Sequence, residues 1–119
     1  MVKDYTEIVG NISEYVGELR KAEPDALSGF YAMVEGACAD GALDKKTKEL
    51  MAMAIAVALR CDGCIGFHAK SLVEQGVTRE ELTEALATCV YMGGGPSLMY
   101  AADALRAYDQ FVRLKPVPV

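Results

Sequence analysis

The chain of 119 residues lacks tryptophan and has a single histidine, and aromatic residues make up only 8% of it. One histidine excludes a metal site built from several imidazole ligands of one chain. No run is long enough to span a bilayer, because the longest apolar run, residues 50–59, is about half of the roughly 20 residues required. Residues 1–7 show no apolar signal-peptide core. We therefore expect a soluble, cytoplasmic protein with no membrane partner.

Basic residues are also scarce, with 12 lysines and arginines against 17 aspartates and glutamates and a net charge of −5. Such an acidic chain repels phosphates, which argues against nucleic acid as a partner. The four cysteines are unevenly spaced, and in a reducing compartment they do not predict a structural disulfide framework. Cys38 and Cys89 stand alone in apolar surroundings. We expect both to be buried core thiols.

What is abundant favours helices. Alanine, leucine, methionine and glutamate outweigh β-branched residues, which predicts an all-α fold. Pro24 and Pro96 suit the first turn of a helix, Asp44 suits an N-cap, and residues 78–81 (Thr-Arg-Glu-Glu) have the spacing of a capping box. We expect one domain over residues 1–119. Its six or so helices are expected at residues 4–20, 24–39, 45–60, 62–75, 78–92 and 96–113.

Glycine and proline set the predicted breaks between helices. Gly76 suits the position just after a helix end, and residues 93–95, three glycines, predict a plain break. A phosphate-binding loop is excluded there, because no strand precedes the glycines and no Lys-Ser/Thr follows them. The last residues, 115–119 (Lys-Pro-Val-Pro-Val), cannot continue a helix and predict a loose tail or an arm on a neighbour.

The helix expected at residues 45–60 is unusual, because after Glu49 it is apolar on every face. Residues 50–59 read Leu-Met-Ala-Met-Ala-Ile-Ala-Val-Ala-Leu. A helix of this kind is normally enclosed by other helices. A chain of this size can hardly surround it alone, so we expect contacts with other subunits to complete its burial.

Reactive side chains gather in residues 61–68, Cys-Asp-Gly-Cys-Ile-Gly-Phe-His. Cys61 and Cys64 can meet across one helical turn, and His68 faces the same side as Cys64. Free backbone N–H groups and the helix dipole stabilise a thiolate at a helix N-terminus. One cysteine would attack an oxidant and become a sulfenic acid, and the other would condense with it to a disulfide. His68 would move the proton, and the spacing leaves open which cysteine attacks.

Glu49 is the fourth candidate, because a partly buried carboxylate at the entrance of an apolar helix needs a partner. In an idealised hairpin Glu49 lies several Å deeper than His68, so a water or a crossing angle would have to close the gap. Zinc at Cys61, Cys64 and His68 would lack a fourth ligand, and we expect neither a metal nor a cofactor. The open alternatives are a structural cysteine pair and a non-catalytic, redox-sensing oligomer.

The order of these motifs resembles the carboxymuconolactone decarboxylase superfamily, specifically its alkylhydroperoxidase-D-like branch. The resemblance covers about residues 43–108 and rests on residues 43–50, 58–61, 64, 68, 76–81 and 91–96. It implies an all-α fold that assembles into homotrimers or homohexamers. This chain departs from the best-known peroxidases of the branch in two ways: they are longer, and they carry a histidine where Gly63 stands.

The resemblance also implies thiol-dependent reduction of hydroperoxides. By position, Cys64 would be the peroxidatic thiol and Cys61 the resolving thiol, while His68 and Glu49 would form a proton relay. A dithiol donor, such as a lipoyl-bearing protein, would reduce the oxidised pair. The decarboxylase branch is similar in fold but generally lacks the cysteine pair. The two cysteines of this chain thus argue against a lactone substrate. The alternative enzyme class is a lyase that would use Glu49 and His68 as base and acid on a small ring lactone.

Overall fold

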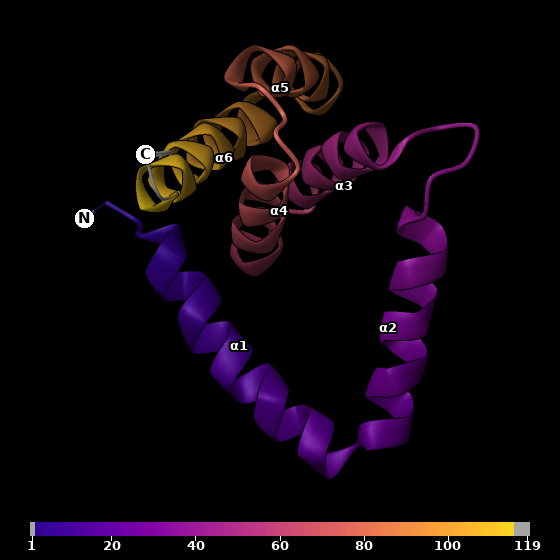
Figure 1. Ribbon diagram of the computed structural model, residues 1–119. Coiled ribbons are helices and arrows are strands. Elements are labelled where there is room, and N and C mark those ends of the chain that lie inside the picture. The colour runs from indigo at the N-terminus through magenta and orange to yellow at the C-terminus, as the bar shows by residue number, and fades with distance from the viewer. Residues whose placement is uncertain (1, 116–119) are drawn as a thin grey trace.

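The computed structural model describes residues 2–115, which form six helices and no strand. This confirms the predicted all-α fold. Helices α3 to α6 form the body of the molecule, and α1 and α2 form a V-shaped arm that projects from it (Figure 1). The helices are α1 (Tyr5–Ala22), α2 (Pro24–Cys38), α3 (Lys45–Ala58), α4 (Asp62–Glu74), α5 (Arg79–Gly93) and α6 (Gly95–Leu114).

Helix starts follow the predicted capping residues. The Asp44 carboxylate accepts a hydrogen bond from the backbone N–H of Thr47 at 2.8 Å. Thr78 and Glu81 form the predicted capping box, in which each side chain accepts a hydrogen bond from the other residue's backbone N–H. These bonds satisfy N–H groups that have no partner within a helix, which fixes where α3 and α5 begin.

Helix ends follow backbone conformations that favour glycine. Gly76 (φ 75°) and Gly94 (φ 73°) have the positive φ that residues with a Cβ rarely adopt. Gly94 lies between α5 and α6, so the glycine run is the plain helix break that the sequence predicts. Helix α3 ends at Ala58, two residues earlier than predicted, because Arg60 turns the chain with a φ of 57°.

The core lies where α4 packs between α3 and α6, with α5 covering one side and the first turns of α1 another. Its fully buried larger side chains come from α1, α3, α4, α5 and the α4–α5 connection, so the core joins the body to the base of the arm. They are Tyr5, Met53, Val57, Ile65, Leu72, Val77 and Leu82.

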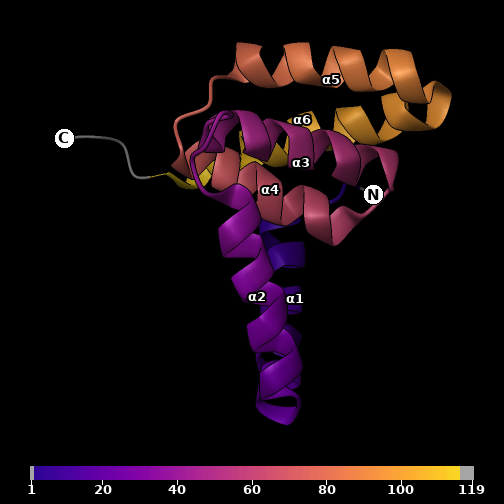
Figure 2. The same cartoon turned by 90° about the vertical axis from the view of Figure 1, so that its right-hand side faces the viewer.

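The arm leaves most of its apolar surface uncovered. Beyond Val9, α1 contributes no buried side chain, and α2 buries none along its whole length. Figure 2 shows both helices extending away from α3 to α6. The exposed apolar side chains of the two arm helices are Ile12, Tyr15, Leu19, Phe30, Met33 and Val34. Apolar side chains therefore run along both arm helices, but within one chain only the first turns of α1 are covered.

The two lone cysteines differ. Cys89 is buried, as predicted, and its thiol donates to the backbone oxygen of Ala54 at 3.3 Å. Cys38 was expected to be buried, but it is only half-buried, because it ends α2 and this helix packs little against the body.

No helix in residues 2–115 combines the length and hydrophobicity that crossing a membrane requires. Lys115 follows the last helix, and the rest of the predicted tail, residues 116–119, lies outside the described residues.

Candidate thiol site

The site begins at the sharp turn between α3 and α4. Arg60 adopts the left-handed conformation, which costs a non-glycine residue about 1–2 kcal/mol. The turn is held by the backbone N–H of Cys61, which donates to the oxygen of Ala56 at 3.1 Å. Cys61 thereby becomes the N-cap of α4, and its Sγ accepts a hydrogen bond from the backbone N–H of Cys64 at 3.2 Å. The turn thus places a sulfur at the positive end of a helix.

Cys61 and Cys64 are joined by a disulfide, with their Cα atoms 5.2 Å apart. This separation lies within the usual range for such a bond. The two sulfurs therefore meet across one turn, as their spacing predicts. Cys64 is the more exposed of the two residues, so an incoming molecule reaches it more readily.

Glu49 and His68 are in direct contact, which the sequence left unsettled. His68 Nδ1 lies 2.5 Å from Glu49 Oε1. The Glu49 side chain is only 9% exposed, whereas that of His68 is 33% exposed. The offset that an idealised hairpin would leave is therefore absent in the structure. The carboxylate holds Nδ1, so Nε2 is the ring nitrogen left for proton transfer.

A shallow cavity of about 210 Å³ lies over this site. Its reactive groups, Cys64 and His68, come from α4, and its apolar wall comes from the end of α3. The wall residues are Ala52, Ile55, Ala56 and Leu59. A small molecule in this cavity would have the exposed cysteine and the imidazole on one side and hydrocarbon on the other.

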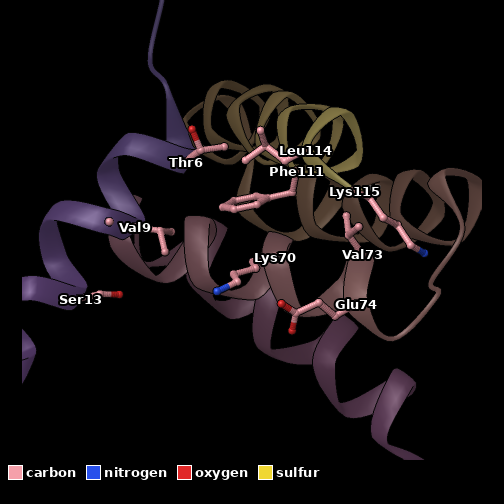
Figure 3. Close-up of a pocket in the computed structure, with 10 residues that line it drawn as sticks. Thr6, Val9, Ser13, Lys70, Val73, Glu74, Phe111, Leu114 and Lys115 are labelled. Carbon is pink, nitrogen blue, oxygen red and sulfur yellow. The ribbon is translucent and has the colours of Figure 1, made fainter. Parts of the chain in front are cut away.

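A larger cavity of about 460 Å³ lies elsewhere, between α1, α4 and α6 (Figure 3). It shares no lining residue with the cavity over the thiol site. Its walls include Val9, Val73 and Phe111, with the charged side chains of Lys70 and Glu74 alongside them. Within residues 2–115, no group of three or more His, Cys, Asp or Glu side chains is arranged to hold a metal ion.

Helix α1 lies directly on the first two turns of α4, and glycines make this possible. A Cβ at position 66 would lie 2.7 Å from Val9 Cγ2, and one at position 63 would lie 2.7 Å from Ile12 Cδ1. A side chain at either position would have to displace α1 residues. This gives a physical reason for glycine at position 63, because Ile12 Cδ1 occupies the space next to it.

Four further residues near the thiols, Lys3, Tyr5, Asp62 and Asp103, were not predicted as part of the site from the sequence. The hydroxyl of Tyr5 donates to Asp62 Oδ1 at 2.8 Å. The Lys3 ammonium donates to the same Asp62 oxygen at 3.0 Å and to Asp103 Oδ2 at 2.9 Å. No sequence pattern relates residues 57 to 100 positions apart, so only the fold reveals this cluster.

The cluster shifts two pKa values. The pKa of Lys3 is raised above its ordinary value, chiefly by the hydrogen bond to Asp103. The pKa of the Tyr5 hydroxyl is also raised, chiefly because burial disfavours the phenolate, and the hydrogen bond to Asp62 adds to the effect. At neutral pH the cluster therefore contains a charged ammonium and a neutral phenol.

Known proteins are similar to this chain in sequence and in fold. The model of the carboxymuconolactone decarboxylase family matches residues 24–107. A protein from Cupriavidus necator is 40% identical over 109 residues, which are 92% of this chain and 96% of that protein. An alkyl hydroperoxide reductase AhpD from Mycobacteroides abscessus is 35% identical over 63 residues, which are 53% of this chain and 36% of that protein.

Solved structures agree with these relationships. A carboxymuconolactone decarboxylase family protein from Legionella pneumophila, in its apo form, has a TM-score of 0.89 and 54% identity and covers 90% of this chain and 96% of its own. A family member from Thermotoga maritima, described with a suggested part in the antioxidative response, has a TM-score of 0.78 and 26% identity over 89% and 91% of the two chains. The resemblance inferred from the motifs is thus confirmed. The chain belongs to the carboxymuconolactone decarboxylase family.

Proposed function

We propose that the protein is a thiol-dependent oxidoreductase that reduces hydroperoxides, or exchanges disulfides, with Cys61 and Cys64. The observation that carries this proposal is the disulfide at the N-terminus of α4, with Cys64 and His68 lining one cavity. Partial identity with an alkyl hydroperoxide reductase AhpD supports it. The hydrogen bond from the Cys64 N–H to the Cys61 sulfur supports it further, because such donors stabilise thiolates.

In the reduced protein, His68 takes the proton of the Cys64 thiol, and the thiolate attacks the distal oxygen of the hydroperoxide. The O–O bond breaks, Cys64 becomes a sulfenic acid, and His68 returns the proton to the departing oxygen, which leaves as an alcohol or water. The Cys61 thiol then attacks the Cys64 sulfur, forms the disulfide and releases one water. Two electrons have passed from the two thiols to the peroxide.

Glu49 acts through His68 in this scheme. Its buried carboxylate holds Nδ1 and stabilises the imidazolium that exists while the ring carries the proton. The relay therefore needs no bridging water between the two side chains, because they are in direct contact. Nε2 remains the atom that exchanges the proton with Cys64 or with the departing oxygen.

A dithiol donor closes the cycle. One donor thiolate attacks a sulfur of the Cys61–Cys64 disulfide, and the second donor thiol then resolves the mixed disulfide, leaving the donor oxidised and the pair reduced. A dihydrolipoyl group on a partner protein fits this requirement. A cytoplasmic location would provide such donors.

We also propose that the chain works as a homotrimer or homohexamer. Met51 and Ile55 of α3, and Leu59 just after it, are about half exposed or more. So are four large apolar side chains of the arm, Tyr15, Leu19, Phe30 and Met33. Other copies of the chain would cover these surfaces, because leaving large apolar patches of a helix exposed to water is energetically unfavourable. Light scattering coupled to gel filtration measures the mass, and a monomer at micromolar concentration would contradict this assembly.

The test of the activity counts thiols. The reduced protein is titrated before and after one equivalent of organic hydroperoxide, and dihydrolipoamide is then added. We expect the Cys61–Cys64 pair to lose two thiols and to regain them with the donor. The protein with both cysteines replaced by serine is the control. Lactone turnover by that variant would instead support a lyase that needs only Glu49 and His68. Oxidation of the pair without turnover would support a redox sensor.

A further inference from the structure

The N-terminal segment is fastened to the thiol site by an anchor, which we define as Lys3, Tyr5, Asp62 and Asp103. Figure 1 shows that the chain enters α1 beside α6, and Asp103 belongs to α6 while Asp62 belongs to α4. The Lys3 ammonium bridges the two carboxylates at 3.0 and 2.9 Å. Asp62 is the residue that directly follows Cys61, so the anchor ends next to a sulfur of the disulfide.

We propose that Lys3 is a positioning residue of the thiol pair: it holds and neutralises the Asp62 carboxylate and so favours the thiolate of the reduced cysteines. The proposal rests on the proposed function only in that the pair cycles between disulfide and dithiol. Lys3 touches neither a sulfur nor a substrate, and it acts through Asp62.

Charge is the first part of the argument. The anchor holds one cation against two carboxylates, and Tyr5, which is fully buried, adds no charge. Without Lys3, two uncompensated carboxylates would remain near the cysteines and oppose the formation of a thiolate. Three other charged or titratable features lie around the first turn of α4. Arg60 directly precedes Cys61 and is unchanged in every variant below, Glu49 and His68 pair with each other, and the Tyr100 ring lies 5.0 Å from the Lys3 ammonium.

Hydrogen-bond competition is the second part. The backbone N–H of Cys64 donates to the Cys61 sulfur at 3.2 Å, and Asp62 occupies the first turn of the same helix. Aspartate at a helix N-terminus readily accepts hydrogen bonds from free N–H groups. Lys3 and Tyr5 both donate to Asp62 Oδ1, which keeps this carboxylate directed away from those N–H groups. The sulfur therefore retains its donor.

The experiment measures the thiolate directly. The full-length protein is reduced and then treated with iodoacetamide between pH 5 and 10, and mass spectrometry quantifies alkylation of the peptide that contains Cys61 and Cys64. Cys38, at the end of α2, is the internal control within each molecule. The variants are Lys3→Met, Lys3→Arg, Asp103→Asn and the double variant Lys3→Met/Asp103→Asn. Lys21→Met is the matched control, because Lys21 pairs only with Glu18 on the same helix among the described ion pairs.

We expect Lys3→Met to slow alkylation of the pair at pH 7 by about three- to tenfold and to move its profile to higher pH. Lys3→Arg should restore the wild-type profile. Asp103→Asn should shift the profile to lower pH. The double variant should lie near the wild type, since it removes one charge of each sign. Cys38 should react equally in all of them.

A purely structural anchor gives a different pattern, in which Asp103→Asn and the double variant impair the pair as Lys3→Met does. That pattern, or an unchanged profile in Lys3→Met, would overturn the proposal. If Lys3→Met fails to fold, as judged by circular dichroism, the shift in Asp103→Asn decides alone: a shift to lower pH supports the proposal and any other result rejects it. The readout is alkylation, so it remains valid even if no peroxide is turned over.

Discussion

His68 Nδ1 lies 2.5 Å from Oε1 of Glu49, and this contact ties α3 to α4 beside the disulfide. The carboxylate is buried, whereas the imidazole is partly exposed toward the cavity that Cys64 lines. The pair thus has one end fixed in the core and one end available for proton transfer. A histidine with only a packing role would be expected to be buried, whereas His68 lines the same cavity as Cys64.

Replacing His68 with glutamine should slow peroxide-driven disulfide formation by about 10²-fold or more, the usual contribution of a positioned acid or base. Glu49→Gln should cause a smaller loss, because the imidazole remains but its ring is no longer held by a charge. Stopped-flow measurement of the second-order rate constant with an organic hydroperoxide checks both values. Glu74→Gln, on the exposed side of α4, is the matched control and should react at the wild-type rate. Equal rate constants in all three variants would show that Glu49 and His68 do not form a proton relay.

Gly66 and Gly10 should respond in opposite ways to alanine. A Cβ at position 66 would meet Val9 Cγ2, whereas one at position 10 would meet nothing within 4 Å. Gly66→Ala should lower the free energy of unfolding by about 1–2 kcal/mol, since the clash outweighs the gain in helix propensity. Gly10→Ala should raise it by about 0.5–1 kcal/mol. Urea unfolding measures both, and a stabilising Gly66→Ala would show that α1 does not pack on α4 as described.

Tyr108 should stabilise the connection between α4 and α5. Its buried hydroxyl donates to the backbone oxygen of Val77 at 2.5 Å. Tyr108→Phe leaves that buried oxygen without its donor, which should cost about 1–3 kcal/mol of unfolding free energy. Tyr91→Phe, at a residue that is 75% exposed, is the control and should change stability little. Indistinguishable unfolding curves for the two variants would contradict the hydrogen bond.

The free energy of unfolding should depend on pH in the acid range because of the Asp109 carboxylate. Its carboxylate accepts two hydrogen bonds from the Arg79 guanidinium, which lower the pKa of Asp109 below the ordinary 3.8. A lowered carboxyl pKa stabilises the fold above the unfolded-state pKa and ceases to do so as the pH falls through the folded-state value. The stability difference between wild type and Asp109→Asn should therefore be present at pH 7 and shrink below pH 3.8.

The Arg79→Gln variant provides the control for this pair. Because Arg79 and Asp109 form one bidentate contact, the double variant should lose little more stability than either single variant. Urea midpoints at several pH values measure this. Additive losses, or a difference that does not shrink as the pH falls below 3.8, would mean that the contact does not form in solution.

Local patterns predicted the elements and most of the thiol site. The capping residues Asp44 and Thr78 mark true helix starts, because a cap is decided by neighbours within four residues. Cys61, Cys64 and His68 lie together because Cys61 caps α4 and the other two belong to its N-terminal part, where residues three or four apart in the sequence are neighbours on one face of the helix. The early end of α3 escaped prediction, since no pattern announces that Arg60 adopts a left-handed conformation.

What the sequence could not predict depends on how helices cross. The Glu49–His68 contact needs α3 and α4 at one particular distance, and the Lys3–Asp62 contact joins residues 59 positions apart. Cys38 illustrates the same limit. Its apolar surroundings in the sequence resemble a core, but α2 belongs to the arm and buries no residue within the chain.

In the proposed mechanism the cysteine pair, and not the Glu49–His68 pair alone, reacts with the oxidant. Each of the variants Cys61→Ser and Cys64→Ser is allowed a single turnover with one equivalent of hydroperoxide, quenched with dimedone and analysed by peptide mass spectrometry, which distinguishes these positions from Cys38 and Cys89. The account predicts a dimedone adduct on Cys64 in the Cys61→Ser protein and none on Cys61 in the Cys64→Ser protein. Peroxide consumption at the wild-type rate by Cys64→Ser, without an adduct on either cysteine position, would contradict it.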